Sequence, residues 1–278
     1  MWINSTRERE KRIMNKEIGF IGCGNMASAM IGGIIKSKIF KANEIIASDA
    51  NEMAVRNAAN NLLIETTNDN KLVARQSKIL VLAVKPMYYS AVIQEIASVV
   101  NEEQIVITIA PGQTIASVEE RFGKKVKVVR TMPNTPALVC EGITGVCAND
   151  NVTQNELDLV CKILSGFGKA EVVGENLMDV VVSVSGSSPA YVFMFIEAMA
   201  DAAVADGMPR DKAYKFAAQA VMGSAKMVLE TGKHPGELKD MVCSPGGTTI
   251  EAVRVLEEKG FRSSVIEAMK ACTQKARK

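Results

Sequence analysis

The sequence predicts an α/β domain with a doubly wound parallel sheet, followed by an all-α domain. Three observations predict it. From Lys16 to Val173, short runs rich in Ile and Val alternate with helical patterns. After Val173 the strand signals stop and only helical periodicity continues. The length of 278 residues is enough for about two domains.

Eight segments are predicted strands because they are almost continuously apolar and are bounded by Gly, Pro, Asn or Asp. Such runs suit strands that helices cover on both faces. The predicted strands are 17–22, 44–48, 62–66, 78–84, 104–109, 126–131, 143–147 and 170–173. The predicted helices between them are 25–37, 50–61, 69–76, 88–99, 114–122 and 153–166.

The second part of the chain is predicted to be helical over 176–206, 210–231, 247–258 and 262–277. No Gly/Ser-rich linker separates the two parts, so we expect a stiff helix to join them. The predicted domains are residues 16–174 and 175–278. Residues 1–15 form an N-terminal extension that is predicted to be disordered.

The charge balance excludes a sequence-independent polyanion binder, and we expect no nucleic-acid partner. The chain has 33 Lys and Arg against 31 Asp and Glu, and residues 1–15 carry the whole excess of two positive charges. The rest of the chain is neutral overall, so anion binding must come from helix termini and a few placed residues such as Lys85.

No metal, membrane or export signal is expected. The six cysteines form no CxxC pair and there is one His, so we expect no metal site and free thiols. The longest uncharged runs, 18–35 and 180–196, are short for a bilayer and contain Gly or Pro. The charged start lacks the apolar core of a secretory signal, which favours a cytoplasmic protein.

A glycine-rich loop follows the first predicted strand and opens a helix. Residues 19–27 read GFIGCGNMA, with Gly22 and Gly24 in the spacing GxGxxA. Gly22 permits a tight turn, and Gly24 lets a diphosphate approach the backbone at the helix N-terminus. The strand–loop–helix context favours a dinucleotide site in a Rossmann-like domain over a purely structural turn.

The second predicted strand ends Ala47-Ser48-Asp49, where such domains read the 2′ position of the cofactor ribose. A carboxylate there accepts bonds from a 2′-hydroxyl and repels a 2′-phosphate, which favours NAD(H). Ser48 and the nearby Arg56 leave NADP(H) open. In a second interpretation, Asp49 only caps the next helix.

Two further segments follow predicted strands at the same edge of the sheet. Lys85 and Pro86 follow the fourth strand, where a Lys points into the ligand crevice or is simply solvated. Residues 131–137 read TMPNTPA, and the two prolines predict a rigid exposed loop. That loop either covers the nicotinamide or is a structural turn.

Three segments of the helical part contain Pro and Gly, which interrupt helices. In SGSSPAY (185–191), Pro189 breaks or starts a helix, and Ser187 or Ser188 is a candidate cap. In CSPGGTTIE (243–251), Thr248 or Thr249 is a candidate cap and Glu251 fits a capping box, which leaves one hydroxyl for a ligand. The lone His234 precedes Pro235 and is interpreted as a turn or cap residue rather than a catalytic base.

Taken together, these segments resemble the pyrroline-5-carboxylate reductases. The resemblance runs from Lys16 to the C-terminus, and its most specific segment is SPGGTTIEAVRVLE at 244–257. The other matching segments are GFIGCGNMA, AVKP at 83–86, MPNTP at 132–136, SGSSPAY, DGMPR at 206–210 and HPGELKD at 234–240.

The resemblance implies a Rossmann-like N-terminal domain and an all-helical C-terminal dimerisation domain. It also implies a homodimer that can join a higher assembly of dimers, and a small-molecule substrate with NADPH or NADH as cofactor. The implied cofactor-binding residues are Gly22, Cys23, Gly24, Asn25, Met26, Asp49, Asn70, Ala83, Val84, Lys85, Pro86, Ala110, Pro111 and Gly112.

The implied catalytic residue is Thr249, beside the substrate ring nitrogen. The implied substrate-binding residues are Ser244, Gly246, Gly247, Thr248 and Thr249. The expected reaction is hydride transfer to the C=N bond of 1-pyrroline-5-carboxylate, which gives L-proline. Asp49 stands where NADP-preferring members often have a neutral residue, so it favours NADH.

Two other functions share parts of this pattern. A β-hydroxyacid dehydrogenase has a similar N-terminal plan but carries a helical GxxxK lysine, which the segment after Gly186 lacks. A non-enzymatic NAD(P)H-sensing Rossmann dimer would bind the cofactor and reduce no imine.

Overall fold

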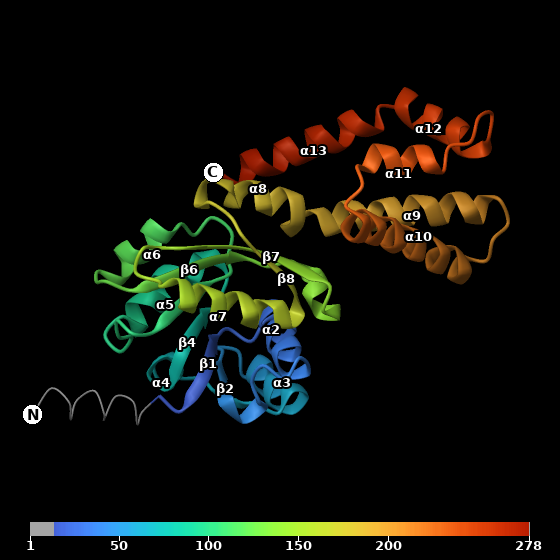
Figure 1. Ribbon diagram of the computed structural model, residues 1–278. Coiled ribbons are helices and arrows are strands. Elements are labelled where there is room, and N and C mark those ends of the chain that lie inside the picture. The colour runs from blue at the N-terminus through green and yellow to red at the C-terminus, as the bar shows by residue number, and fades with distance from the viewer. Residues whose placement is uncertain (1–13, 278) are drawn as a thin grey trace, which may run out of the picture. The chain divides into compact units, whose positions relative to one another are not determined.

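A computed structural model describes residues 14–277 of the chain. The predicted N-terminal extension therefore lies almost entirely outside the described residues. The chain forms two compact units (Figure 1). The first contains the described residues up to Gly186 and those from Thr273, and the second is Ser187–Cys272.

The first unit is built on an eight-stranded sheet in the order β3-β2-β1-β4-β5-β6-β7-β8. Neighbouring strands are parallel except for β6 and β7, which are antiparallel. The strands are β1 (Lys16–Ile21), β2 (Ile45–Ser48), β3 (Glu65–Thr67), β4 (Ser77–Leu82), β5 (Ile105–Thr108), β6 (Lys127–Met132), β7 (Gly142–Ala148) and β8 (Gly168–Val172).

The sheet departs from the predicted parallel order at β7, which runs antiparallel to β6. The connection from β6 to β7 contains only the 3₁₀-helix η3 (Thr135–Val139). A parallel neighbour needs a crossover of a dozen or more residues, so this short connection turns the chain back.

Helices cover both faces of the sheet, as the apolar strands predict (Figure 1). The two faces bury separate cores: α2, α3 and α7 pack on one, and α4, α5 and α6 on the other. Alternate strand residues divide between the cores, so that Ile18 and Phe20 face the first and Ile21 the second. These helices are α2 (Asn25–Lys36), α3 (Glu52–Leu62), α4 (Asn70–Gln76), α5 (Tyr89–Ile96), α6 (Ile115–Phe122) and α7 (Gln154–Leu164).

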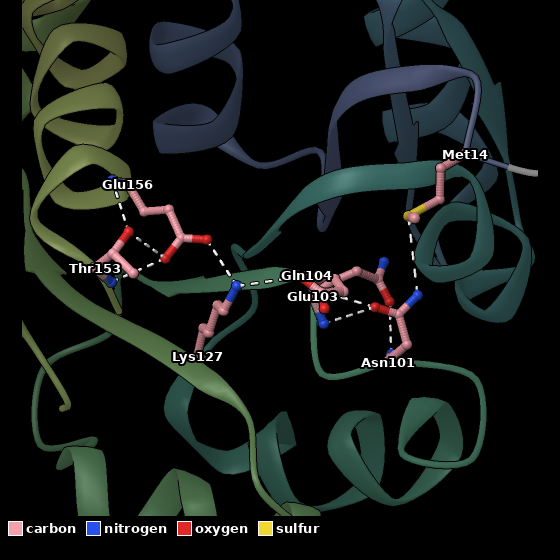
Figure 2. A network of polar contacts seen from close by, with 7 residues as sticks. All are labelled: Met14, Asn101, Glu103, Gln104, Lys127, Thr153 and Glu156. Carbon is pink, nitrogen blue, oxygen red and sulfur yellow. Dashed lines mark hydrogen bonds and ion pairs between the residues drawn. The ribbon is translucent and has the colours of Figure 1, made fainter. Parts of the chain in front are cut away.

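A network of polar contacts lies where β6 begins (Figure 2). The Lys127 ammonium lies 2.7 Å from Glu156 and 3.6 Å from Glu103. Glu156 also forms a capping box with Thr153 at the start of α7. This network ties a strand to a helix and to the loop before β5, and it contains none of the predicted site residues.

The predicted helix 176–206 is not one regular α-helix. It consists of the 3₁₀-helix η5 (Glu175–Leu177), α8 (Met178–Val181), the π-helix η6 (Val182–Gly186) and α9 (Ser188–Ala205). By length and composition the stretch Glu175–Ala205 passes for a membrane span, with a mean hydropathy of 1.4 and 17% of its most apolar window buried. The uncharged run 180–196 is by itself too short to span a bilayer, but helical structure continues on both sides of it.

The second unit is helical, as predicted. Besides α9 it contains α10 (Arg210–Thr231), α11 (Pro235–Met241), α12 (Thr248–Glu258) and α13 (Phe261–Ala276), which ends in the first unit. Its core is thin, and large apolar side chains such as Phe193, Met194 and Phe216 are more than 60% exposed. An apolar surface of this kind is typical of a subunit interface.

Candidate active site

The glycine-rich loop joins β1 to α2 in the conformation that its sequence predicts. Gly22 has φ +109°, and a Cβ there would lie 2.5 Å from the Ala83 carbonyl oxygen, so no other residue fits. Gly24 is the N-cap of α2, and a Cβ on it would meet no atom within 4 Å. No side chain caps α2, so the first N–H groups of the helix are free for an anion.

Asp49 holds this loop. Its Oδ2 accepts a hydrogen bond of 2.8 Å from the Cys23 N–H, and its Oδ1 accepts one of 2.9 Å from the Asn51 N–H. The interpretation of Asp49 as the cap of the next helix was wrong, because Asn51 caps α3. Burial, together with the charge of Asp49, raises the pKa of the Cys23 thiol to about 12. The thiol therefore stays protonated at neutral pH.

A cavity of about 710 Å³ opens beside this loop at the carboxyl ends of β1, β2 and β4. Its volume is within the range of small-molecule sites. The predicted residues that line it are Gly22, Gly24, Asp49, Asn70, Ala83, Val84 and Lys85. Tyr88 and Glu95 also line it, although no sequence pattern pointed to them.

The other predicted cofactor residues do not line this cavity. Cys23 and Asn25 border a neighbouring cavity of about 430 Å³, which Gly24 shares. Met26 lies in the first turn of α2, and Pro86 begins the 3₁₀-helix η2 (Pro86–Tyr88). Ala110, Pro111 and Gly112 follow β5, the strand next to β4.

Asn70, the first residue of α4, is bonded on both sides. The fully buried Ser48 donates a hydrogen bond of 2.7 Å to its Oδ1. Its Nδ2 donates a hydrogen bond of 2.8 Å to the Glu95 carboxylate on α5. These three residues form a chain of hydrogen bonds that reaches the cavity from β2.

Tyr89 is a further residue that sequence analysis missed. Its buried hydroxyl donates to the Leu82 carbonyl and accepts from the Ile109 N–H, at 2.8 and 3.3 Å. Burial raises its pKa, so it remains a donor at neutral pH. It thereby joins the carboxyl ends of β4 and β5, from which the segments 83–86 and 110–112 continue.

The segment 131–137 is not the exposed loop that its prolines predict. Asn134 is only 7% exposed, and residues from Thr135 form η3, whose Ala137 is buried in the core. The Asn134 side chain accepts from the Ile143 N–H and donates to the Ser185 carbonyl in the π-helix. Its buried amide ties three segments together, so it has a structural role.

The predicted substrate residues lie in the second unit, where α12 begins. Gly247 is the N-cap, and its N–H donates to the Ser244 carbonyl, while Gly246 supplies a turn with φ +67°. The predicted caps were wrong: neither Thr248 nor Thr249 caps α12. The capping box is also wrong because Glu251 pairs with Arg254.

The segment SGSSPAY and the turn at His234 each lie at the start of a helix. Pro189 lies at the start of α9, as predicted, but Ser187 at the N-cap makes no capping bond, and its hydroxyl instead accepts from the Cys272 thiol. His234 is a cap, as predicted, because its Nδ1 accepts from the Gly236 N–H at 3.0 Å. The helix α11 that follows it was not predicted.

Comparison with known proteins identifies this architecture. The family model for pyrroline-5-carboxylate reductase dimerisation matches residues 175–278, and that for coenzyme F420-dependent NADP oxidoreductases matches 17–112. The pyrroline-5-carboxylate reductase of Escherichia coli (strain K12) is 54% identical over 265 residues, covering 95% of this chain and 98% of that relative. The chain belongs to the pyrroline-5-carboxylate reductase family.

Solved structures of pyrroline-5-carboxylate reductases agree. The enzyme from Coxiella burnetii superposes with a TM-score of 0.88 at 34% identity, over 95% of this chain and 98% of that one. The Plasmodium falciparum pyrroline carboxylate reductase, solved with NADP bound, gives a TM-score of 0.86 at 32% identity over the same shares. These findings confirm the resemblance, the fold class, the nicotinamide cofactor and the homodimer that the sequence predicts.

Proposed function

We propose that this chain reduces the C=N bond of 1-pyrroline-5-carboxylate to give L-proline, with NAD(P)H as hydride donor, in the last step of proline biosynthesis. The observation that carries the proposal is the cavity beside Gly22 and Gly24, where an uncapped helix meets the carboxyl edge of a parallel sheet. A relative 54% identical over nearly the whole chain supports the specific reaction.

The residues of the cavity fit a dinucleotide. The open space at Gly24 and the free N–H groups of α2 suit a diphosphate. Lys85 lines the same cavity and makes no ion pair within residues 14–277, so its charge is available to the cofactor. The bound cofactor supplies the hydride, and these residues bind and orient it.

The substrate end is assigned to the start of α12. The N–H groups that follow Gly247 have no side-chain cap, so they are donors for the substrate carboxylate, with Ser244 and Gly246 shaping the turn before them. The Thr249 hydroxyl orients the ring nitrogen. A protonated imine is already electrophilic, so the site needs no strong protein acid, and positioning is its main contribution.

Asp49 favours NADH over NADPH in this proposal. Both of its oxygens already accept a backbone N–H, and each retains a second lone pair for a ribose hydroxyl. A 2′-phosphate at the same position would meet the negative charge of the carboxylate.

The helical unit, within residues 175–278, forms the dimerisation and substrate domain. The exposed apolar side chains of α9 and α10, such as Phe193 and Phe216, are covered by the second copy of the chain. This accounts for the apolar stretch Glu175–Ala205 without a membrane. The dimers assemble further, and the enzyme works in the cytoplasm.

The test follows absorbance at 340 nm with the imine substrate and either NADH or NADPH. We expect absorbance to fall only when the imine is present, L-proline to form, and kcat/KM to be higher with NADH. Silence with both cofactors would refute the reductase. Binding of cofactor without turnover would favour the sensing dimer, and turnover of a hydroxy acid alone would favour the dehydrogenase.

A further inference from the structure

Glu95 is a charged residue that lines the cofactor cavity from α5, and the mechanism above gives it no task. Its carboxylate accepts a hydrogen bond of 2.8 Å from the Asn70 Nδ2. Asn70 follows the ends of β2 and β3, close to the position where Rossmann-like domains bind the adenosine ribose. Glu95 therefore lines the cavity and also contacts the amide of Asn70, which lines it too.

The chemistry of the two neighbours fixes which way this amide faces. An ionised carboxylate only accepts hydrogen bonds, so the group facing Glu95 must be the amide nitrogen. The amide oxygen then faces Ser48, whose hydroxyl can donate to it, at 2.7 Å. Because a hydroxyl both donates and accepts, Ser48 alone would tolerate either orientation. The carboxylate is the group that selects one.

We propose that Glu95 is a positioning residue that holds the Asn70 amide in a single orientation toward the adenosine half of the cofactor. One N–H and one oxygen lone pair of Asn70 remain free for that ligand. This inference rests on the proposed function, because it takes a dinucleotide to be the occupant of the cavity. A preorganised amide binds more tightly, since the ligand need not select one orientation.

The sharpest variant is Glu95→Gln, which keeps the size of the side chain but can both donate and accept. Both orientations of Asn70 then satisfy their neighbours. We expect the Kd and KM for NADH to rise about three- to tenfold, the scale of one hydrogen bond, with kcat unchanged. Inhibition by ADP-ribose should weaken by the same factor, while inhibition by nicotinamide mononucleotide should not change.

The matched control is Glu102→Gln, which makes the same change of charge at an exposed residue before β5, away from the cavity lining. It should leave the affinity for NADH unchanged. Unchanged affinity in Glu95→Gln, or an equal loss in Glu102→Gln, would overturn the proposal.

A double-mutant cycle separates positioning from a direct effect of the Glu95 charge. In an Asn70→Ala background, Glu95→Gln should have no further effect on the Kd for NADH. A full additional loss there would show that Glu95 acts independently of Asn70 and would overturn the inference. If the unaltered protein binds neither NADH nor NADPH, the proposed function itself fails, which is a different outcome from unaltered binding in the variant.

Discussion

The starts of α2 and α12 use the same device in different settings. Each helix begins after a glycine N-cap in extended conformation, and in neither does a side chain cap the first N–H groups. The start of α2 is anchored by Asp49, and the helix buries residues such as Met30 and Ile31 in the core. Helix α12 buries no residue within its own chain.

The two proposed anion sites therefore depend on different parts of the protein. The residues that line the cavity beside α2 follow the edge of a folded sheet and all belong to one compact unit. The site at α12 lies on a unit with large exposed apolar side chains, so we expect the dimer to stabilise its surroundings. Substitutions at the first site should affect cofactor binding, and those at the second should affect turnover.

The largest effect is expected for Gly22→Ala. The added Cβ would lie 2.5 Å from the Ala83 carbonyl oxygen at a φ of +109°, so the loop must move away from its position beside β4. We expect kcat/KM to fall about 100-fold, for a strain of a few kcal/mol, mainly through weaker cofactor binding. Isothermal titration with NADH measures this.

The matched control is Gly32→Ala within α2, where the new Cβ would only touch Leu62 at 3.8 Å. It should keep cofactor affinity and raise the free energy of unfolding by up to about 1 kcal/mol. Equal losses of affinity in both variants would contradict a specific role for the Gly22 turn.

Thr249→Ala is expected to lower kcat/KM about tenfold or more, the scale of one lost polar contact. Because Thr249 does not cap α12, the melting temperature should not change. Thr248→Ala, the matched control, should have a smaller effect because only the backbone of Thr248 is proposed to bind the substrate. Steady-state kinetics and thermal melts of both variants measure these effects. An unchanged kcat/KM in Thr249→Ala would contradict the proposed role of its hydroxyl.

Asp49→Ser tests how far loop anchoring and cofactor choice depend on one carboxylate. The preference for NADH over NADPH should fall about tenfold, because a repulsive charge is removed from the ribose position. Affinity for both cofactors should also weaken, since the Cys23 N–H loses its partner. A higher kcat/KM with NADPH in the unaltered enzyme, with little change in the variant, would refute the assignment.

The smallest effect is expected at the Lys127 network, which lies outside both sites. Burial raises the pKa of Glu156, but hydrogen bonds from Lys127 and Thr153 more than offset it, so the pKa lies below its ordinary value. A lowered folded pKa stabilises the fold above the unfolded pKa of about 4.3, and this contribution is lost as the pH falls through the folded value.

Glu156→Gln should therefore cost less than about 1 kcal/mol at pH 7. Urea unfolding at pH 7 and pH 3 measures it, and the difference from the unaltered protein should shrink at the lower pH. Because none of the predicted site residues belongs to this network, kcat/KM should not change. A loss of activity with unchanged stability would contradict the structural role.

The conformation of the glycine-rich loop is predicted well because it depends on residues that are adjacent in the sequence. Gly22 and Gly24 carry the turn and the close approach in the backbone itself, and the flanking strand and helix are visible in the apolar pattern. The direction of β7 follows from its short connection to β6, which the pattern of alternating strands and helices does not take into account. The burial of Asn134 depends on tertiary packing, which turn residues do not encode.

The site was predicted less completely for the same reason. Glu95 is an exposed glutamate on a helix, a position with no sequence signature until the fold brings it to Asn70. The Thr248 and Thr249 caps were wrong because Gly247 takes the N-cap position and leaves both threonines inside the helix. Local rules cannot choose between these neighbouring starts of one helix.

The most direct test of this division of tasks measures cofactor binding and turnover separately in two variants. We predict that Thr249→Ala binds NADH as tightly as the unaltered protein while turning over the imine at least about tenfold more slowly, and that Gly22→Ala loses NADH binding. Loss of NADH binding in Thr249→Ala, or full binding in Gly22→Ala, would contradict the account.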